Sequence, residues 1–431
     1  MSCSLCRLPY TPSTISVAPR WPPPGVLSEK QILYLKHAFG AGQYVVGLAL
    51  EMVNMGLSST QCSLQPRPDQ PSDNNNFAVN NAAIVVNIVW ETNSKTLLTF
   101  HLHCATILRH QLGLPDDSPV NLIELSLLEQ IVGPTMDRLH AGRLPDFNYE
   151  GVLGAADQSR IDIESLWSKE GDSRPDFDWL EWQRRGLDWT AVRPDVFPRF
   201  RPQVAPTRIS SLGALPESAE DIITIQPLDV LHVLLPYLDN RSFVNLLSTC
   251  RTLRHQALTI FQPHSRKRVL ELGWAVPTDV EYAEFVKRNP PPPVATSPTT
   301  PTSPTEHKAG EAESGEESTS IQPWTDELDF SLVAMSHPKH SPFDADWFLY
   351  LSQVHRTQAM RCRRWVWALA KELTRIYHDK RAAGPYGDVL EGDGGRTKSP
   401  AWKRHAQTAS QQLMIRGILL STRKGEKNMS W

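Results

Sequence analysis

The sequence predicts an α+β fold that is mainly α-helical and rich in loops. Apolar residues recur at steps of three and four over several stretches, most densely at residues 228–257. Apolar and polar residues alternate over residues 95–103, as in a strand with one buried face. Residues 289–322 are rich in Pro, Ser, Thr and Glu and have almost no large apolar side chain to bury. These patterns predict short helical units, a small β-hairpin and a long disordered insert.

Composition and charge exclude several classes of protein. The chain has 431 residues, of which 40% are hydrophobic, and a formal net charge of −3. It is therefore too apolar to be wholly disordered and too nearly neutral to coat nucleic acid. No apolar run reaches the roughly 18 residues that a membrane span needs, and residues 1–10 have no secretory pattern. We expect a protein of the cytoplasm or nucleus with six reduced cysteines, no membrane partner and no nucleic-acid partner.

The N-terminal part is expected to combine helices with one hairpin. Residues 28–55 have helical spacing after Ser28, a residue type that caps helices. Residues 82–91 are rich in Val and Ile, and together with residues 95–103 they predict a β-hairpin with one buried face. Two more helices, each ended by a glycine, are expected at residues 104–112 and 118–132.

Four tryptophans lie in an acidic, Pro-punctuated stretch at residues 156–200. Loops that hold indole rings are either packed over a core or left exposed for a partner. The sequence favours the first alternative and leaves the second open. The four residues are Trp167, Trp179, Trp182 and Trp189.

The segment from residue 225 to residue 257 predicts three short helices. Pro227 suits the first position of a helix, and a turn at residues 239–242 can cap a second helix. A third helix is expected after Cys250. Helices this short are not stable alone, so their apolar faces must be buried together or against a partner.

The order of these features resembles an F-box, the short helical motif that docks onto the Skp adaptor of cullin–RING ubiquitin ligases. The resemblance covers residues 225–259 and rests on Pro227, on Leu238-Asp239, and on the run Cys250-Arg-Thr-Leu-Arg254. It departs from the usual pattern at Gln226, where the family has leucine. Segments on both sides of the linker are similar to fungal F-box proteins with a Cys-containing N-terminal region.

The resemblance implies a protein-interaction role in protein ubiquitination. The chain would be the substrate-receptor subunit that links an unknown protein substrate to a Skp–cullin–RING ligase, and it would not be an enzyme. An apolar groove of the adaptor would bind the first helix. The residues implied at that contact are Pro227, Leu228, Leu231, Leu234, Leu235, Leu238, Phe243, Leu246, Leu247 and Cys250.

Two alternatives remain open. Leucines at helical spacing are common in ordinary helical bundles, so they could form a core and nothing more. The chain would then be a zinc-stabilised interaction scaffold with no link to ubiquitination. A hydrolase would need a nucleophile with a base, and no such motif is present, although convergent sites escape motif searches.

Two pairs of metal-binding residue types lie far apart in the sequence. Cys3-Ser-Leu-Cys6 places two thiolates on one side of a tight turn, and His101-Leu-His-Cys104 offers a histidine and a cysteine where a strand enters a helix. Together they could form a tetrahedral zinc site that ties the N-terminal residues to the hairpin. The alternative is that the cysteines are free, with Cys104 in a helix core. The substitute ligands are His103 and Cys62.

Changes in composition divide the chain into seven segments. The clearest boundary is the Pro-rich tract that begins at residue 289, and no repeat with a period of roughly 20 to 50 residues is present. The segments are an N-terminal α/β region with the zinc site (1–200), a linker (201–220), the F-box (221–260), a helical segment (261–288), a disordered Pro/Ser/Thr/Glu-rich linker (289–322), a C-terminal helical region (323–383) and a flexible basic tail that can hold a short helix (384–431).

The linker and the region beyond it carry two further predictions. Ser297, Thr300 and Ser303 each precede a proline in an extended tract, so they are candidate phosphorylation sites of a proline-directed kinase, or else the tract is an inert tether. Residues 347–377 predict one long helix with an apolar stripe against a core and a basic face in solvent.

Overall fold

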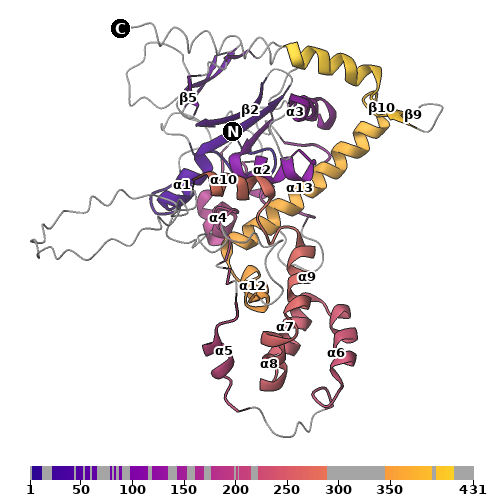
Figure 1. Cartoon of the computed structure of the whole chain (residues 1–431). Coiled ribbons are helices and arrows are strands. Elements are labelled where there is room, and N and C mark those ends of the chain that lie inside the picture. Colours follow the sequence, from indigo (N-terminus) through magenta and orange to yellow (C-terminus); the bar gives the residue numbers. More distant parts are fainter. Residues whose placement is uncertain are drawn as a thin grey trace, which may run out of the picture. The chain divides into compact units, whose positions relative to one another are not determined.

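The computed structural model of the chain is mainly helical, with small antiparallel sheets in its N-terminal part (Figure 1). It divides into two compact units, and each is described by itself. Unit 1 comprises Met1–Asp195 and Val354–Trp431, and unit 2 comprises Val196–Gln353. The structure describes residues 2–11, 22–42, 45–51, 54–58, 61–65, 78–79, 82–83, 87–89, 98–114, 119–133, 143–152, 161–168, 176–198, 200–201, 203–214, 222–288, 345–390 and 395–411.

The main sheet of unit 1 has three antiparallel strands in the order β2-β1-β8. The central strand β1 (His37–Gly42) pairs with β2 (Val45–Glu51) on one edge and with β8 (Leu98–His101) on the other. Phe39 of β1 lies opposite Phe100 of β8, and both side chains are buried. A second sheet contains β3 (Asn54–Ser58), β4 (Gln61–Gln65) and β7 (Asn87–Val89). A third contains β5 (Ala78–Val79) and β6 (Ala82–Ala83).

The helix predicted at residues 28–55 is wrong beyond its first turns. Ser28 does cap a helix, α1 (Glu29–Lys36), but the chain then continues directly into β1. Gly40 and Gly42 lie in this stretch, and each glycine costs a helix about 1 kcal/mol relative to alanine. Strand pairing on both edges of β1 outweighs the local helical spacing.

The predicted β-hairpin is wrong in its pairing. β8 pairs with β1, whereas the two strands within residues 82–91, β6 and β7, pair with β5 and β4. All four residues of β8 are buried, so this strand has no solvent-facing side. Its polar residues find partners inside the unit, as where Thr99 Oγ1 donates to the carbonyl oxygen of Ser2 at 3.3 Å. The turn expected at residues 92–94 lies outside the described residues.

Three helices complete the core of unit 1. α2 (Leu102–Gln111) and α3 (Pro119–Val132) confirm the two helices predicted in this region. α13 (Gln358–Ala383) packs against both, although it lies far along the chain. Its buried side chains belong to the same apolar core as those of α2 and β8. Unit 1 is therefore built from two distant stretches of sequence.

The tryptophans of residues 156–200 are packed into this core. They lie in or beside three short helices, η1 (Glu164–Leu166), α4 (Trp179–Arg184) and η2 (Asp188–Ala191). Edge-to-face contacts link neighbouring rings, as between Trp179 and Trp182, whose centroids are 5.5 Å apart. The first of the two alternatives for these loops is confirmed, because each indole is buried. The buried set is Trp167, Trp179, Trp182 and Trp189.

The single long helix predicted at residues 347–377 is interrupted. α12 (Trp347–Val354) ends before Thr357, the N-cap of α13. The two helices bury their apolar stripes in different cores, since the boundary between the units falls between Gln353 and Val354. The predicted C-terminal helical region, residues 323–383, is therefore divided between the two units. After α13 a two-stranded hairpin, β9 (Val389–Leu390) and β10 (Arg396–Thr397), precedes helical residues 400–411.

Unit 2 is a set of short helices. The three helices predicted around residues 225–257 are present, and Asp239 caps the second by accepting hydrogen bonds from the backbone N–H groups of Arg241 and Ser242. Pro227 is the N-cap of the first helix, one position before the predicted place. The helices are α5 (Pro206–Ser210), within the predicted linker, α6 (Leu228–Leu234) with η3 (Leu235–Tyr237), α7 (Asn240–Ser248), α8 (Arg251–Thr259), α9 (Gln262–Leu272), α10 (Asp279–Arg288) and most of α12.

Side chains from the two ends of unit 2 form its second packing centre. Phe200 stacks edge-to-face on Trp347, with ring centroids 4.9 Å apart. The Tyr350 hydroxyl donates to the carbonyl oxygen of Ala275 at 2.8 Å, and Gln262 Oε1 accepts from the N–H of Phe348 at 2.9 Å. These bonds attach α12 to α9 and to the segment that follows it. Unit 2 thus includes residues from beyond the linker.

Some predicted features fall on residues that the structure does not describe. The linker at residues 289–322 is among them, with its three candidate phosphorylation sites Ser297, Thr300 and Ser303. The end of the basic tail, residues 412–431, is another. Within the described part of the chain, no helix combines the length and the apolar character needed to cross a membrane.

Candidate metal centre and docking surface

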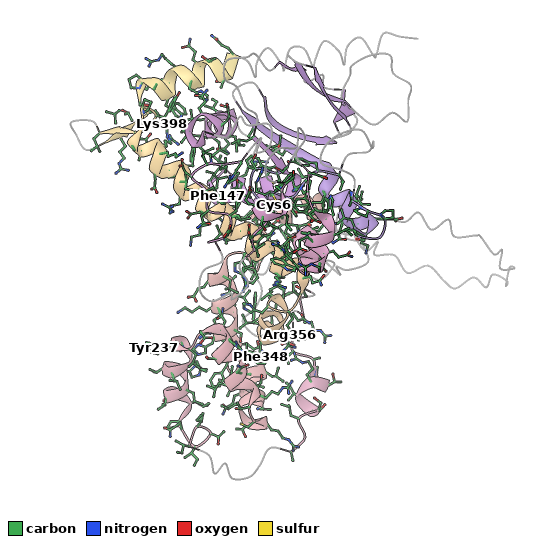
Figure 2. All side chains as sticks on the ribbon, turned by 180° about the vertical axis from the view of Figure 1, so that it is seen from behind. Cys6, Phe147, Tyr237, Phe348, Arg356 and Lys398 are labelled. Carbon is green, nitrogen blue, oxygen red and sulfur yellow. The ribbon has the colours of Figure 1, made fainter. Side chains whose placement is uncertain are left out.

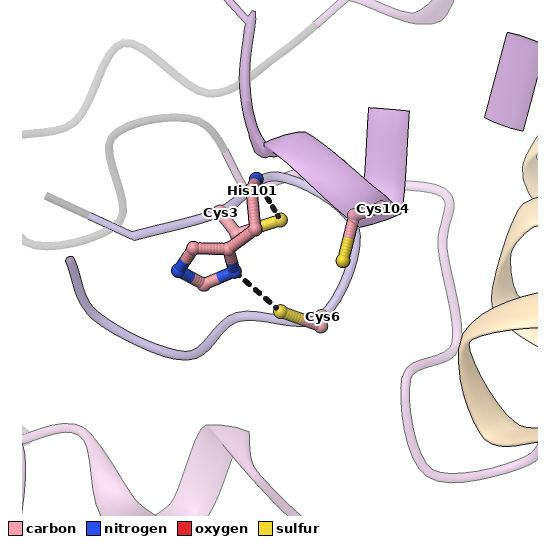
Figure 3. Close-up of side chains that lie close together, drawn as sticks. All are labelled: Cys3, Cys6, His101 and Cys104. Carbon is pink, nitrogen blue, oxygen red and sulfur yellow. Dashed lines mark hydrogen bonds between the residues drawn. The ribbon is translucent and has the colours of Figure 1, made fainter. Parts of the chain in front are cut away.

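A tight turn at the start of the chain brings Cys3 and Cys6 together. The N–H of Cys3 donates to the carbonyl oxygen of Leu8 at 3.0 Å, and the N–H of Arg7 donates to that of Cys3 at 2.9 Å. Arg7 has a φ of +60°, which is rare for a residue with a side chain and closes the turn tightly. The two thiols therefore point to the same side (Figure 3).

The second ligand pair lies where β8 becomes α2. His101 is the last residue of β8 and Cys104 lies in the first turn of α2. The N-terminal turn is bound along this strand, because the N–H of Ser4 donates to the carbonyl oxygen of Thr99 at 2.7 Å. The strand-to-helix change thus directs a histidine and a cysteine at the same point as the Cys3 and Cys6 thiols.

The structure brings all four predicted ligands into one buried cluster. The sulfur atoms of Cys3, Cys6 and Cys104 and a ring nitrogen of His101 lie within 4.8 Å of one another. Cys6 Sγ is 3.3 Å from His101 Nδ1, and the side chains are at most 1% exposed (Figures 2 and 3). With metal–sulfur bonds of about 2.3 Å, tetrahedral ligands lie roughly 3.8 Å apart, so small side-chain shifts would close this shell. The cluster could hold a metal ion.

The thiols of this cluster are electrostatically unequal. Burial by itself would raise the pKa of Cys3, but hydrogen bonds from Cys104 and Cys6 and the nearby His101 hold it well below its usual range. Burial raises the pKa of Cys6, and hydrogen bonding to Cys3 raises that of Cys104. The pKa of Cys3 is therefore the lowest of the three, and a bound cation would favour the thiolate form of all three, since thiolates are the ligating form.

The nitrogen of His101 that faces the cluster is Nδ1, which lies 3.3 Å from Cys6 Sγ. The rings of Tyr10 and Tyr34 pack against the imidazole, with centroids 4.6 Å and 5.5 Å away. Among the described atoms, buried Nε2 of His101 has no hydrogen-bond partner. Of the substitute ligands, His103 is not part of the cluster, and its Nδ1 is 3.7 Å from Asp195 Oδ1. Cys62 lies on β4, and its side chain is outside the part of the chain that the structure describes.

The predicted adaptor-binding residues divide between an interior and an exterior set. Leu231, Leu235, Phe243 and Leu247 are at most 1% exposed and form the core of the three-helix segment. Such residues cannot contact a partner while the segment stays folded. Pro227, Leu228 and Leu234 are exposed, and Leu238, Leu246 and Cys250 are half-buried.

A second apolar stripe on the first helix escaped the sequence interpretation. Val230, Val233, Leu234 and Tyr237 are spaced as i, i+3, i+4 and i+7, and they are 46%, 66%, 42% and 83% exposed. We call these four residues the α6 apolar face, although Tyr237 belongs to η3, which continues directly from α6; Figure 2 labels Tyr237. The periodicity was visible in the sequence, but the leucines on the opposite side of the helix dominated the pattern. Three further exposed apolar residues precede the helix, namely Ile222, Ile223 and Ile225.

Helix α9 holds the first helix and the following turn in place. Arg268 donates to the carbonyl oxygens of Leu235 and Leu238 at 2.6 Å and 2.7 Å, and its guanidinium lies 4.3 Å from the centre of the Phe243 ring. His232 Nδ1 lies 2.7 Å from His264 Nε2 of α9. The helix that carries the α6 apolar face is therefore held in place by contacts with α9.

Comparison with known proteins identifies no relative of this chain. No family model matches the chain, and neither the curated proteins nor the solved structures contain a match.

Proposed function

We propose that this chain is an F-box-type receptor that docks onto a Skp-type adaptor and is not itself an enzyme. The observation that carries the proposal is that α6 is apolar on two opposite sides. One side packs Leu231 and Leu235 inside unit 2, and the other is the exposed α6 apolar face. A helix that is apolar all round is normally buried all round, so a partner is expected to cover the second side.

The charge of the segment indicates the chemistry of that partner. Residues 222–276 carry more basic than acidic side chains, although the whole chain is acidic with a net charge of −3. An acidic adaptor with an apolar groove would be attracted to this segment as a whole, which speeds association. The basic residues are Arg241, Arg251, Arg254, Arg266, Lys267 and Arg268, and the acidic ones are Asp229, Asp239 and Glu271.

The proposal is tested by measuring the affinity of the full chain for a purified Skp-type adaptor by calorimetry. Val233→Glu places a carboxylate in the middle of the α6 apolar face, where binding would bury it without a partner. We expect the affinity to fall at least tenfold, which corresponds to about 1.4 kcal/mol or more. Tyr237→Ser should also weaken binding, because large aromatic side chains dominate such interfaces.

A matched control distinguishes this surface from apolar exposure in general. Leu180 on α4 is 60% exposed, close to the 66% of Val233, but it lies in unit 1. Leu180→Glu should leave the affinity unchanged. If wild-type protein does not bind the adaptor, or if Val233→Glu binds it as well as wild type does, the proposal is wrong.

We also propose that the metal of the buried cluster is zinc and that its role is structural. Three sulfur ligands and one nitrogen ligand form a set that zinc favours, and they leave no open position for a substrate. Cys3 and Cys6 would hold the N-terminal turn to His101 and Cys104, which stabilises unit 1. The residues do not need to perform any reaction for this role.

Elemental analysis of the purified chain tests the zinc proposal. We expect about one zinc ion per chain in the wild type, and its loss in Cys3→Ser and in Cys104→Ser, because a hydroxyl is a poor replacement for a thiolate. Cys250→Ser is the control, since Cys250 lies outside the cluster and in unit 2. Native protein that is free of zinc, or zinc that survives both substitutions, would contradict the assignment.

A scaffold with no link to ubiquitination is the second candidate. The buried cluster of three cysteines and one histidine favours the scaffold, because a structural metal centre stabilises an interaction domain whatever partner the domain binds. The adaptor measurement separates the two candidates. Protein that contains zinc but does not bind the adaptor would support the scaffold.

A further inference from the structure

Arg7 follows directly after the ligand Cys6 and has an unusual backbone. Its φ of +60° is the only positive value at a non-glycine residue in the described part of the chain. Glycine adopts this conformation without strain, whereas a residue with a side chain persists there only when its surroundings hold it. The side chain of Arg7 is only 1% exposed, so those surroundings are the interior of unit 1.

The guanidinium of Arg7 joins the turn to a distant part of the unit. Its Nε donates to Glu164 Oε1 of η1 at 2.5 Å, and its Nη1 donates to Ser2 Oγ within the turn. Glu164 is in turn 3.6 Å from Arg143. An arginine fork can hold two such partners at once because its N–H groups have a fixed geometry.

The backbone and the ring face of Trp167 complete this attachment. Trp167 Nε1 donates to the carbonyl oxygen of Arg7 at 3.1 Å, and the Arg7 guanidinium lies 5.4 Å from the centre of the same indole. On the other side of the residue, its N–H is bound to the carbonyl oxygen of Cys3. Arg7 is therefore held at its N–H, its carbonyl oxygen and its side chain.

We infer that Arg7 is a positioning residue for the metal centre. By holding the +60° turn in place, it directs Cys6 Sγ towards Cys3, His101 and Cys104. The inference rests on the proposal that the cluster binds zinc and goes beyond it by naming what orients the ligands. Glycine at position 7 would adopt the turn but would have no side chain to bind Glu164 and Ser2. The side chain of Arg7 is therefore what fixes the turn to the rest of unit 1.

Release of zinc and the spectrum of cobalt test this role in the full chain. Arg7→Met keeps a long side chain but removes the hydrogen bonds to Glu164 and Ser2, and Arg7→Gly removes the anchor while relaxing the backbone. Both should release zinc to a chromogenic chelator at least tenfold faster than wild type does. In cobalt-loaded protein the visible bands, which report ligand geometry, should shift in both variants. Arg7→Lys, which keeps a charge for Glu164, should restore part of the slow release.

A buried arginine elsewhere in unit 1 is the control for general destabilisation. Arg363 is 0% exposed and donates to the carbonyl oxygen of Pro194 at 3.2 Å. Arg363→Met should keep the wild-type cobalt spectrum and zinc release. Should Arg7→Met fail to fold, Glu164→Gln is measured instead, since it removes the charge of the anchor and leaves an acceptor.

The outcomes separate this inference from the zinc proposal. If wild-type protein retains neither zinc nor cobalt, both the zinc proposal and the role of Arg7 are wrong. If wild-type protein binds both metals but Arg7→Met and Arg7→Gly match it in release rate and spectrum, only the role of Arg7 is wrong. Equal changes in Arg363→Met would also overturn that role.

Discussion

Leu231 and Leu234 lie one turn apart on α6 but have opposite environments. Leu231 is 1% exposed and packs inside unit 2, whereas Leu234 is 42% exposed and belongs to the α6 apolar face. Both were predicted to contact an adaptor. A substitution at Leu231 would reduce binding simply by unfolding the segment, so only changes on the exposed side can test docking.

The two leucines should therefore differ sharply in their effect on stability. Leu231→Ala leaves a cavity in a packed core and should lower the free energy of unfolding by about 2 to 5 kcal/mol. Leu234→Ala should change it by about 0.5 kcal/mol or less, as is typical of exposed positions. Hydrogen exchange of peptides from residues 222–276, measured over a urea series, gives the free energy of unfolding of unit 2 separately from that of unit 1. Equal losses in both variants would contradict the burial described for α6.

At the residue scale, the members of the candidate metal cluster could be predicted, but the residues that hold them in place could not. Cys3, Cys6, His101 and Cys104 were identifiable because each pair has a ligand spacing of its own within the sequence. Nothing local distinguishes Arg7 from any other arginine, because its role depends on Glu164 and Trp167, which are distant in the sequence. The α6 apolar face was missed for a different reason, since its valines were overshadowed by the neighbouring leucines.

At the scale of elements, the contact between α6 and α9 is sensitive to pH. His232 Nδ1 and His264 Nε2 are 2.7 Å apart, so at most one of the two rings can be charged without strong repulsion. Burial lowers the pKa of His264 below its usual 6.5, and the nearby His232, Arg268 and Lys267 lower it further. All the neighbours that act on His264 here are basic, and they favour its neutral form.

Unit 2 should therefore lose stability on mild acidification. Because the pKa of His264 is lower in the folded state, the stabilisation is complete above about pH 6.5 and is lost as the pH falls from there through the folded-state pKa. Urea unfolding of unit 2, followed by hydrogen exchange between pH 7.5 and about pH 5, should show this decline. His264→Gln should make the decline shallower. If the variant and the wild type have the same pH dependence, the histidine pair does not control it.

Helices could be predicted better than strands. α2, α3 and the three short helices of unit 2 have local signals that set their bounds, such as Gly113 with a φ of +71° after α2 and the Asp239 cap of α7. β1 has no such signal. Its glycines and short apolar residues fit several structures, and only its pairing with β2 and β8 decides between them.

For the whole molecule, composition predicted a linker but not the division of the described residues into two units. The tract at residues 289–322 separates two ordered stretches, which predicted a separate helical region at residues 323–383. The structure instead assigns α12 to unit 2 and α13 to unit 1. The apolar stripe of a helix indicates that it is buried but not which core buries it, so this division could not be predicted from composition and spacing.

The two-part construction of unit 1 has a consequence for its synthesis. On the ribosome, residues 1–195 emerge well before α13, by roughly ten to forty seconds at the usual 5 to 20 residues per second. During that interval the nascent chain lacks the helix whose Trp365 and Leu369 complete the core. All four residues of the candidate metal cluster lie within residues 1–104 and are already present. Early metal capture would therefore hold the turn, β8 and α2 together while the rest of the core awaits translation.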